Sequence, residues 1–179
     1  MKPLRLRVRV ALVLGVFVCA ALAAIASAQT YKISTVAGGT DAGDGLAAAA
    51  AELSSPEGLA IDAAGNVYIS DSADNRVRKV SPDGVVTTVA GDGYPGSRDN
   101  ELNFPYGLAV DSAGALYIAD LGNARIRKVA ADGTVTTVAS GPPLVAPRNL
   151  AADRDGNLYV SDFGGNVDAD VYAKILTNG

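Results

Sequence analysis

One segment of sequence is repeated three times along this chain. The first copy, 53–71, and the second, 102–120, agree at most positions, and a looser third copy follows. The prolines near the start of the copies, Pro56, Pro105 and Pro147, stand 49 and 42 positions apart. Between them lie short runs of alternating apolar residues separated by turns rich in Gly and Asp. A period in the forties with this content is typical of the four-stranded blades of a β-propeller.

Four strands are predicted in each full copy. In the first copy they cover 58–62, 66–70, 76–80 and 85–90. Apolar residues alternate with polar or small ones in these segments, and Val, Ile and Thr are abundant, which favours strands over helix. Short turns that contain Gly, at 62–66 and 81–84, connect the first strand to the second and the third to the fourth. The predicted fold class is therefore all-β.

The second half of the repeat is the most regular part. Segment 76–80 returns at 125–129 with one substitution, and 86–90 returns unchanged at 135–139. Together with the Pro-x-Gly-Leu-Ala and Tyr-Ile-x-Asp runs that precede them, these segments resemble the NHL-repeat family. The third copy keeps the proline, aspartate and tyrosine positions and departs at 164–170. The resemblance covers nearly all of the chain beyond residue 28 and implies a propeller of NHL-type four-stranded blades.

The number of blades is an open question in the sequence. Repeats are predicted at about 53–91, 102–140 and 144–176, and 33–38 resembles a fourth strand with no blade before it. The third repeat has no fourth strand of its own. NHL propellers usually have about six blades. Three blades therefore indicate a partial propeller, a fragment of a longer chain, or half of a six-bladed ring that a homodimer completes.

The first 28 residues have the three parts of a secretory signal peptide. Basic residues precede an apolar run from about Val10 to Ile25, and Ala26-Ser27-Ala28 offers a cleavage site. The apolar run is short for a membrane span of about 20 residues. We expect cleavage after Ala28, no stable membrane span afterwards, and a secreted or periplasmic propeller domain at 29–179.

Loss of this peptide makes the chain more acidic. Four of the fifteen basic residues and none of the nineteen acidic ones lie in 1–28, which leaves a net charge of −8. Such a charge is poorly suited to binding nucleic acid or anionic membranes. The single cysteine, Cys19, leaves with the signal, so no disulfide is expected.

Polar residues that recur in every copy are predicted to be scaffold. Asp62, Asp111 and Asp153 end the first strands, where a carboxylate can accept backbone N–H bonds across the following turn. The same role is expected for the aspartates after the second strands: Asp71, Asp120 and Asp162. Two of them are also expected to pair with arginines, Asp71 with Arg76 and Asp120 with Arg125. The recurrent tyrosines are expected to pack between sheets, with the hydroxyl at the edge: Tyr68, Tyr117 and Tyr159.

Two further segments have local interpretations. The alanine tract 47–51 predicts one or two turns of helix with Asp44 as the N-cap. Segment 153–157 has the Asp-x-Asp-Gly-Asn order of a calcium loop, but the acid expected at the twelfth position is replaced by Gly164. A hairpin turn is the prediction there.

Recognition is expected where the copies differ. The position after the proline is acidic, aromatic and basic in turn, Glu57, Tyr106 and Arg148, and it lies near the mouth of the predicted central channel. The loop between the first two repeats adds Tyr94 and Arg98, and the loops after the second strands add Leu121 and Phe163. Exposed aromatic and arginine residues suit a protein, peptide or glycan partner.

The residue types argue against an enzyme. The chain has no histidine, which removes the commonest metal ligand and general base, and no cysteine outside the signal. We therefore expect no catalytic residue, metal or cofactor, and favour a non-enzymatic interaction module. The resemblance also implies alternatives. One is a lyase or lactonase-like enzyme with a carboxylate-bound metal, for which Glu57 is the best ligand. The other is a piece of a sensor or adhesion ectodomain.

Overall fold

The structure, a computed structural model, describes residues 37–39 and 43–164, and the backbone of 171–176. The predicted signal peptide and cleavage site, most of the strand predicted at 33–38, and most of the divergent segment 164–170 lie outside these residues. Within the described part, no helix is both long enough and apolar enough to cross a membrane.

The described strands form three antiparallel sheets, and within each sheet the strands lie in chain order. The first sheet, blade 1, contains β1 (Pro56–Ile61), β2 (Val67–Asp71), β3 (Arg76–Val80) and β4 (Val86–Ala90). Blade 2 contains β5 (Pro105–Val110), β6 (Leu116–Asp120), β7 (Arg125–Val129) and β8 (Val135–Ser140). Blade 3 contains β9 (Pro147–Ala152), β10 (Asn157–Asp162) and β11 (Val171–Leu176). The predicted all-β fold of propeller blades is confirmed.

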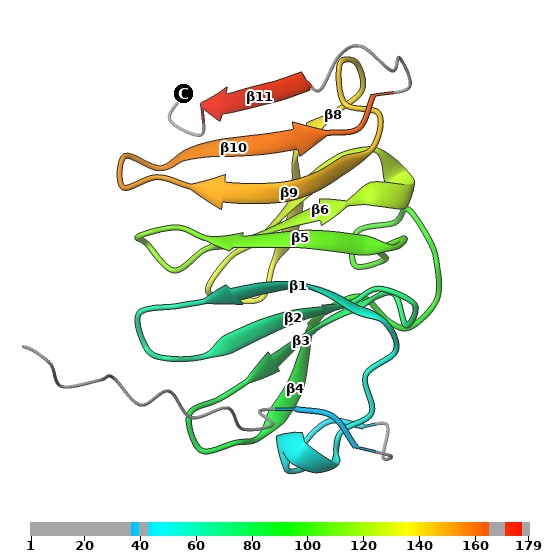
Figure 1. The fold of residues 1–179 in the computed structure, drawn as a ribbon, viewed down its shortest axis with the longest axis vertical. Coiled ribbons are helices and arrows are strands. Elements are labelled where there is room, and N and C mark those ends of the chain that lie inside the picture. Colours follow the sequence, from blue (N-terminus) through cyan, green and yellow to red (C-terminus); the bar gives the residue numbers. More distant parts are fainter. Residues whose placement is uncertain (1–36, 40–42, 165–170, 177–179) are drawn as a thin grey trace, which may run out of the picture. The chain divides into compact units, whose positions relative to one another are not determined.

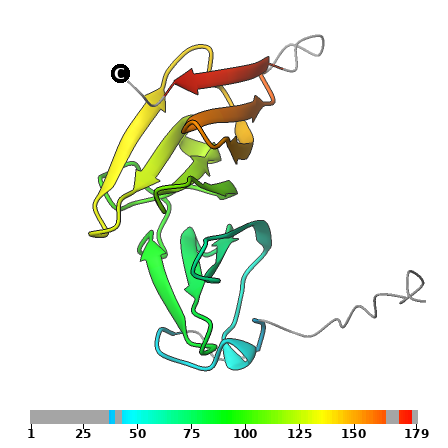
Figure 2. The same ribbon diagram turned by 90° about the vertical axis from the view of Figure 1, so that its left-hand side faces the viewer.

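The first strands of the three blades lie side by side. Figure 1 shows β1, β5 and β9 stacked along the middle of the view, and the turned view in Figure 2 shows β8, in yellow, at the outer edge of its blade. The approach between the first strands is close: a Cβ on Gly58 would stand 2.1 Å from the carbonyl oxygen of Tyr106. A Cβ on Gly107 would stand equally close, 2.1 Å, to the carbonyl oxygen of Arg148. Glycine is required at both positions because no larger residue fits beside a neighbouring backbone.

The hydrophobic core lies between the blades. The back face of blade 1 carries Tyr68 and Val77, which cluster with Leu108 and Ile118 on the front face of blade 2. A second cluster repeats this contact between blades 2 and 3 with the following buried members: Ala109, Ala115, Tyr117, Ala119, Ile126, Leu144, Leu158 and Val160. Side chains alternate between the two faces of a strand, so each blade offers one face to the blade before it and the other to the blade after it.

The alanine tract forms less helix than predicted. It contains a single 3-10 turn, η1 (Ala48–Ala50), and Asp44 does not cap it. The Asp44 carboxylate instead accepts hydrogen bonds from Nη2 of Arg78 (3.0 Å) and from the hydroxyl (2.9 Å) and backbone N–H (2.9 Å) of Thr88. The N-cap prediction was wrong because these donors on blade 1 hold the carboxylate. The turn places Ala48 in a cluster with Ile69 on β2, Val80 on β3 and Val86 on β4.

The aspartates that end the first strands bind the following turns, as predicted. Asp62 Oδ1 accepts the N–H groups of Ala64 (3.0 Å) and Asn66 (2.9 Å), and Asp111 and Asp153 make the equivalent pairs of bonds. The tyrosine hydroxyl of each blade donates to the same carboxylate at 3.1 Å. Segment 153–157 is therefore a hairpin turn, and its first carboxylate is engaged within it.

Candidate functional site

The aspartates that end the second strands fix the start of the first strands. Asp120 Oδ1 accepts the N–H of Asn103 at 2.7 Å, and Asp162 accepts those of Val145 (2.9 Å) and Ala146 (3.2 Å). Asp71 accepts the N–H of Ser54. The prediction that they accept backbone N–H bonds from the turn after them was wrong, because antiparallel pairing brings the end of each second strand beside the proline that starts the first. Asp120 does contact that turn through a side chain, since Nδ2 of Asn123 donates to its Oδ2 at 2.8 Å.

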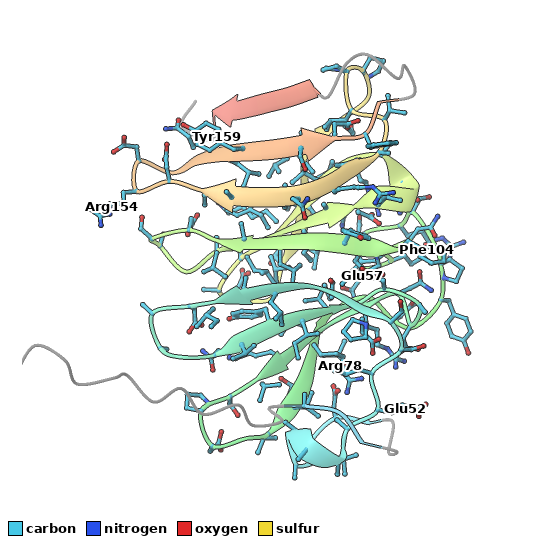
Figure 3. The ribbon with its side chains drawn as sticks, in the orientation of Figure 1. Glu52, Glu57, Arg78, Phe104, Arg154 and Tyr159 are labelled. Carbon is cyan, nitrogen blue, oxygen red and sulfur yellow. The ribbon has the colours of Figure 1, made fainter. Side chains whose placement is uncertain are left out.

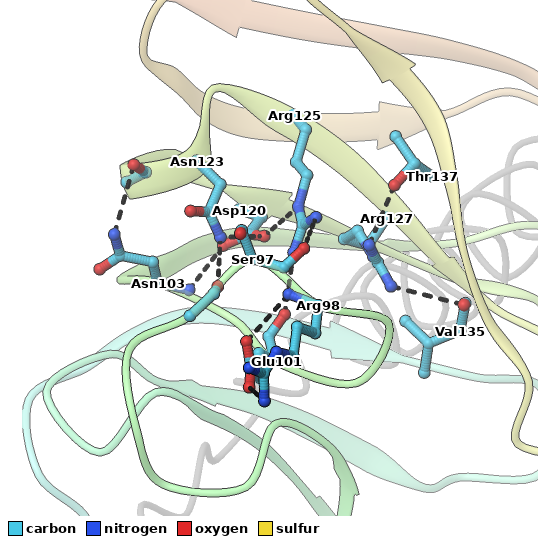
Figure 4. Close-up of polar contacts among 12 residues, drawn as sticks. Ser97, Arg98, Glu101, Asn103, Asp120, Asn123, Arg125, Arg127, Val135 and Thr137 are labelled. Atoms are coloured by element: carbon cyan, nitrogen blue, oxygen red, sulfur yellow. Dashed lines mark hydrogen bonds and ion pairs between the residues drawn. The ribbon is translucent and has the colours of Figure 1, made fainter.

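One of the two predicted arginine pairs with these aspartates is present. Nε of Arg125 lies 2.6 Å from Asp120 Oδ2, and both side chains are buried (Figure 4). Arg76 does not pair with Asp71 but with Asp74, at 2.7 Å. Blade 2 has the neutral Asn123 where blade 1 has Asp74, so Arg125 meets no competing acid there.

Asp71 forms no salt bridge with any residue that the structure describes, and burial is the main influence on its pKa. Burial raises the pKa of Asp71 above its ordinary value, while the hydrogen bond from the Ser54 N–H acts in the opposite direction. The buried aspartates therefore serve as acceptors that hold the chain at each proline. Because the backbone is fixed at the proline, the position of the next residue is fixed as well.

Three of the predicted site residues occupy this anchored position at the start of the first strands: Glu57, Tyr106 and Arg148. Figure 3 shows Glu57 and Phe104 at the end of the molecule where β1 and β5 begin, opposite Arg154 in the turn between β9 and β10. We call the residues at this end the rim: Glu57, Phe104, Tyr106, Arg148 and Phe163. Glu57 and Arg148 are exposed and Tyr106 is half-buried.

Three rim residues from separate segments meet. The guanidinium carbon of Arg148 on β9 lies 5.3 Å from the ring centroid of Tyr106 on β5 and 5.3 Å from that of Phe163, which follows β10. Phe163 remains 67% exposed. Arg148 forms no ion pair with any residue that the structure describes. The arrangement is an exposed, uncompensated arginine held against two rings.

Hydrogen bonds between blades fix the backbone beneath this cluster. The hydroxyl of Ser70 donates to the carbonyl oxygen of Tyr106 at 2.6 Å, and the hydroxyl of Ser72 donates to that of Pro105. The N–H of Gly58 donates to the same Ser70 oxygen at 2.6 Å. Blade 2 carries Ala119 and Leu121 at the two serine positions, so the boundary between blades 2 and 3 lacks these bonds.

The other predicted site residues do not join the arginine cluster. Arg98 pairs with Glu101 in its own loop, with Nη1 and Oε1 3.8 Å apart, and Tyr94 is exposed on the same loop. Leu121 starts the 3-10 turn η2 (Leu121–Asn123) and is half-buried. Glu57 accepts a 3.4 Å hydrogen bond from the hydroxyl of Ser55 and keeps an exposed carboxylate.

Phe104 is a rim residue that the sequence analysis missed. Its side chain is 54% exposed and its backbone has a φ of 50°, held by a hydrogen bond from its N–H to Asn75 Oδ1 at 3.0 Å. The signal was an aromatic residue directly before the proline, where the other copies have Ser55 and Ala146. A bulky residue with left-handed backbone is uncommon.

Two further features of the described residues bear on chemistry. They contain no group of three or more Asp, Glu, Cys or His side chains placed to hold a metal ion. A shallow pocket of about 610 Å³ lies beside β8, lined by Asp99, Arg127 and Thr137 among others, and no predicted site residue lines it.

The fold and the rim together define a class of protein. A β-propeller is built from sheets of antiparallel strands in chain order. These sheets pack face to face with their first strands together, as the three blades do here. A family model described as the teneurin NHL domain matches residues 29–99, and one described as the NHL repeat matches 102–129. The chain belongs to the NHL-repeat family.

Solved structures share the fold at low sequence identity. A protein of unknown function from Bacteroides thetaiotaomicron is 23% identical with a TM-score of 0.59 and is matched over 75% of this chain and 38% of its own. A gluconolactonase from Xanthomonas campestris is 23% identical with a TM-score of 0.54, over 68% and 43%. Virginiamycin B lyase from Staphylococcus aureus is 19% identical with a TM-score of 0.51, over 69% and 42%. This chain thus spans about two fifths of the length of each of these chains. No curated protein matches it.

Proposed function

We propose that this chain is an exported, non-enzymatic NHL-repeat module whose rim binds a carboxylate-bearing peptide, protein or glycan. The observation that carries the proposal is the arginine held against two aromatic rings: Arg148 with Tyr106 and Phe163. Stacked rings cover the faces of a guanidinium and leave its N–H edge for a partner. A carboxylate accepts two parallel hydrogen bonds from that edge.

The support beneath the cluster favours binding with little rearrangement. Tyr106 is fixed through its carbonyl oxygen by Ser70, and Arg148 follows a proline whose neighbours are anchored by Asp162. A contact group that is already held in place loses less conformational entropy on binding. Exposed aromatic residues beside an arginine are the side chains that contribute most at protein interfaces.

The acidic groups of the scaffold favour a binding role over catalysis. Asp62, Asp120 and Asp162 are each engaged by two or more hydrogen bonds that maintain the blades. Glu57 is the rim carboxylate. The activities in the names of the lyase and the gluconolactonase belong to those proteins, whose likeness to this chain is one of fold.

Binding of immobilised acidic polymers by the purified protein tests the proposal. We expect polygalacturonate or polyglutamate to bind, and the methyl-esterified or amidated forms of the same polymers to bind at least about tenfold more weakly, because esters and amides lack the anionic oxygens. Replacement of Arg148 by Gln should reduce binding to a similar extent. The matched control is Arg154→Gln, at an exposed arginine on the opposite end of the strands, which should bind like the wild type.

Equal binding by the Arg148 and Arg154 variants would contradict the proposed rim site. A metal measurement addresses the enzymatic alternative separately. If the purified protein holds a stoichiometric metal that is lost in Glu57→Ala, the non-enzymatic assignment is wrong. Polygalacturonate without polyglutamate binding would identify a glycan ligand, and the reverse would identify a peptide or protein.

A further inference from the structure

The front face of blade 1 exposes apolar residues that are covered in the other blades. Leu59 and Ile61 on β1 are both 68% exposed, whereas Leu108, which aligns with Leu59 in blade 2, is 5% exposed. Leu150, the aligned residue of blade 3, is partly buried against blade 2. The pattern of the strand is the same in all three blades, so the difference comes from what lies in front of each blade. Ala48 and Ala51 cluster with residues of β2, β3 and β4, and this cluster contains no residue of β1.

The chain itself shows what covers this face elsewhere. Leu108 belongs to the cluster of Tyr68 and Val77, with Ala60 packed against it, all on the back face of blade 1. One blade later, Leu150 packs against the cluster that contains Tyr117 on the back face of blade 2. The natural cover for Leu59 and Ile61 is therefore the back face of another NHL blade.

One back face is also open among the described residues. On blade 3, Tyr159 is 43% exposed and Ala151 is exposed, although their counterparts on blade 2, Tyr117 and Ala109, are 1% and 6% exposed. The front of blade 1 and the back of blade 3 thus have the two surfaces that already pack together twice within the chain. They cannot meet each other in one chain, because blade 2 lies between them.

We propose that two copies of this chain associate, with the front face of blade 1 of each copy packed on the back face of blade 3 of the other. The contact occurs twice, related by a two-fold axis, and closes a ring of six blades. It continues the interface that already joins the blades within one chain. Rings form when such a front-to-back contact closes.

Asn149 distinguishes this contact from the two within the chain. It takes the position of Gly58 and Gly107, where a Cβ would lie 2.1 Å from the carbonyl oxygen of the neighbouring strand. In the dimer that neighbour is the carbonyl oxygen of Glu57 in the second copy. The contact between copies must therefore be wider at this point than the contacts between blades of one chain, and association should be reversible.

Sedimentation equilibrium over a range of protein concentrations tests the proposal. The wild type should move from the mass of one chain toward the mass of two as concentration rises to about 1 mM. Leu59→Asp should remain at the mass of one chain, because the carboxylate would be buried in the contact. Asn149→Gly should lower the dissociation constant by about tenfold, because it lets the strands approach.

Val145→Asp is the matched control, since Val145 is 54% exposed but lies on neither contact face. Its mass profile should follow that of the wild type. Circular dichroism of each variant confirms that the blades are folded, so that a gain or loss of association is compared between folded proteins. A mass of one chain at every concentration for both the wild type and Asn149→Gly would overturn the proposal, as would a dimer that Leu59→Asp leaves intact.

Discussion

At the scale of single residues, short polar side chains decide where the backbone turns and where it starts again. Asp62 holds the turn after its strand, whereas Asp120 reaches back to the segment before the first strand of its blade. The same residue type therefore has two structural roles at two positions of the repeat. The difference follows from which backbone N–H groups lie within reach, and only the three-dimensional pairing of the strands sets that.

The carboxylate of Asp62 should make stability depend on pH in acid. Burial acts to raise its pKa, but hydrogen bonds from Asn66, Tyr68 and Ala64 outweigh burial and hold the pKa below the ordinary value of 3.8. A lowered pKa in the folded state contributes stability above the unfolded value and loses it as pH falls through the folded value. Asp62→Asn should be about 1 kcal/mol less stable at pH 7.

The difference between Asp62→Asn and the wild type should shrink below a pH of about 3.8, where the wild-type carboxylate takes up its proton. Urea unfolding at a series of pH values measures it. Glu52→Gln, at an exposed acid, is the control and should leave the profile unchanged. A gap that stays constant from pH 7 to pH 2 would show that the hydrogen bonds do not depend on the charge.

Gly107 tests how closely the first strands must approach. A Cβ there would stand 2.1 Å from the carbonyl oxygen of Arg148, so Gly107→Ala must push blades 2 and 3 apart. We expect a loss of about 2 kcal/mol in the free energy of unfolding. Gly43→Ala, whose new methyl would meet only a Leu46 side-chain atom at 3.7 Å, should have little effect. Equal stability of the two variants would mean that the strands separate at no cost.

At the scale of the strand and blade, equivalent positions of the repeat differ in how much they stabilise the fold. Arg125 on β7 is buried and binds Asp120, with two further bonds from its guanidinium to the carbonyl oxygens of Ser97 and Glu101 (Figure 4). Arg76, the same position of β3, is part-exposed and pairs with Asp74. The strands that contain the two arginines are nearly identical in sequence, so their different environments come from the loops around them.

Replacement of these two arginines by methionine should separate the two environments. Arg125→Met leaves the carboxylate of Asp120 buried without its cation and should cost about 3 kcal/mol of unfolding free energy. Arg76→Met removes a pair near the surface and should cost less than about 1 kcal/mol. Chemical denaturation of both variants provides the comparison. Similar losses would contradict the assignment of Arg125 as the buried tie of blade 2.

The sequence predicts the strands well for a physical reason. Alternating apolar residues between Gly-containing turns leave one arrangement that buries both faces, so the predicted strands of blade 1 agree with β1–β4 to within two residues. The main difference is at the start of β1, which begins at Pro56 rather than residue 58. There the pairing with β2 shifts register between Pro56 and Leu59, an irregularity that the residue pattern does not reveal.

The site is less predictable than the fold. Variation between copies pointed to Tyr106, Arg148 and Phe163, but nothing in the sequence says that these three meet, since they lie on different blades or loops. The same reasoning also included Arg98, which pairs within its own loop, and missed Phe104. Variation between the copies identifies residues that are not needed to maintain the blade. Whether such residues contact each other depends on how the blades pack.

At the scale of the whole molecule, the three blades present two different ends. The turns between first and second strands lie at one end, and their aspartates are engaged in local hydrogen bonds. The rim lies at the other end, where the repeated scaffold holds unlike residues in equivalent places: Glu57, Tyr106 and Arg148. A repeat that keeps its backbone structure and changes the residue at one equivalent position of each blade is suited to recognition at that end of the fold.

The most direct test of this account is a titration of isotopically labelled protein with an oligogalacturonate, followed by NMR. We expect the largest backbone shift changes at Tyr106, Arg148 and Phe163, with the turns 62–66 and 111–115 at the opposite end unchanged. An acidic peptide is titrated in the same way. Shift changes centred on those turns, or none with either ligand, would contradict the assignment of the rim as the binding surface.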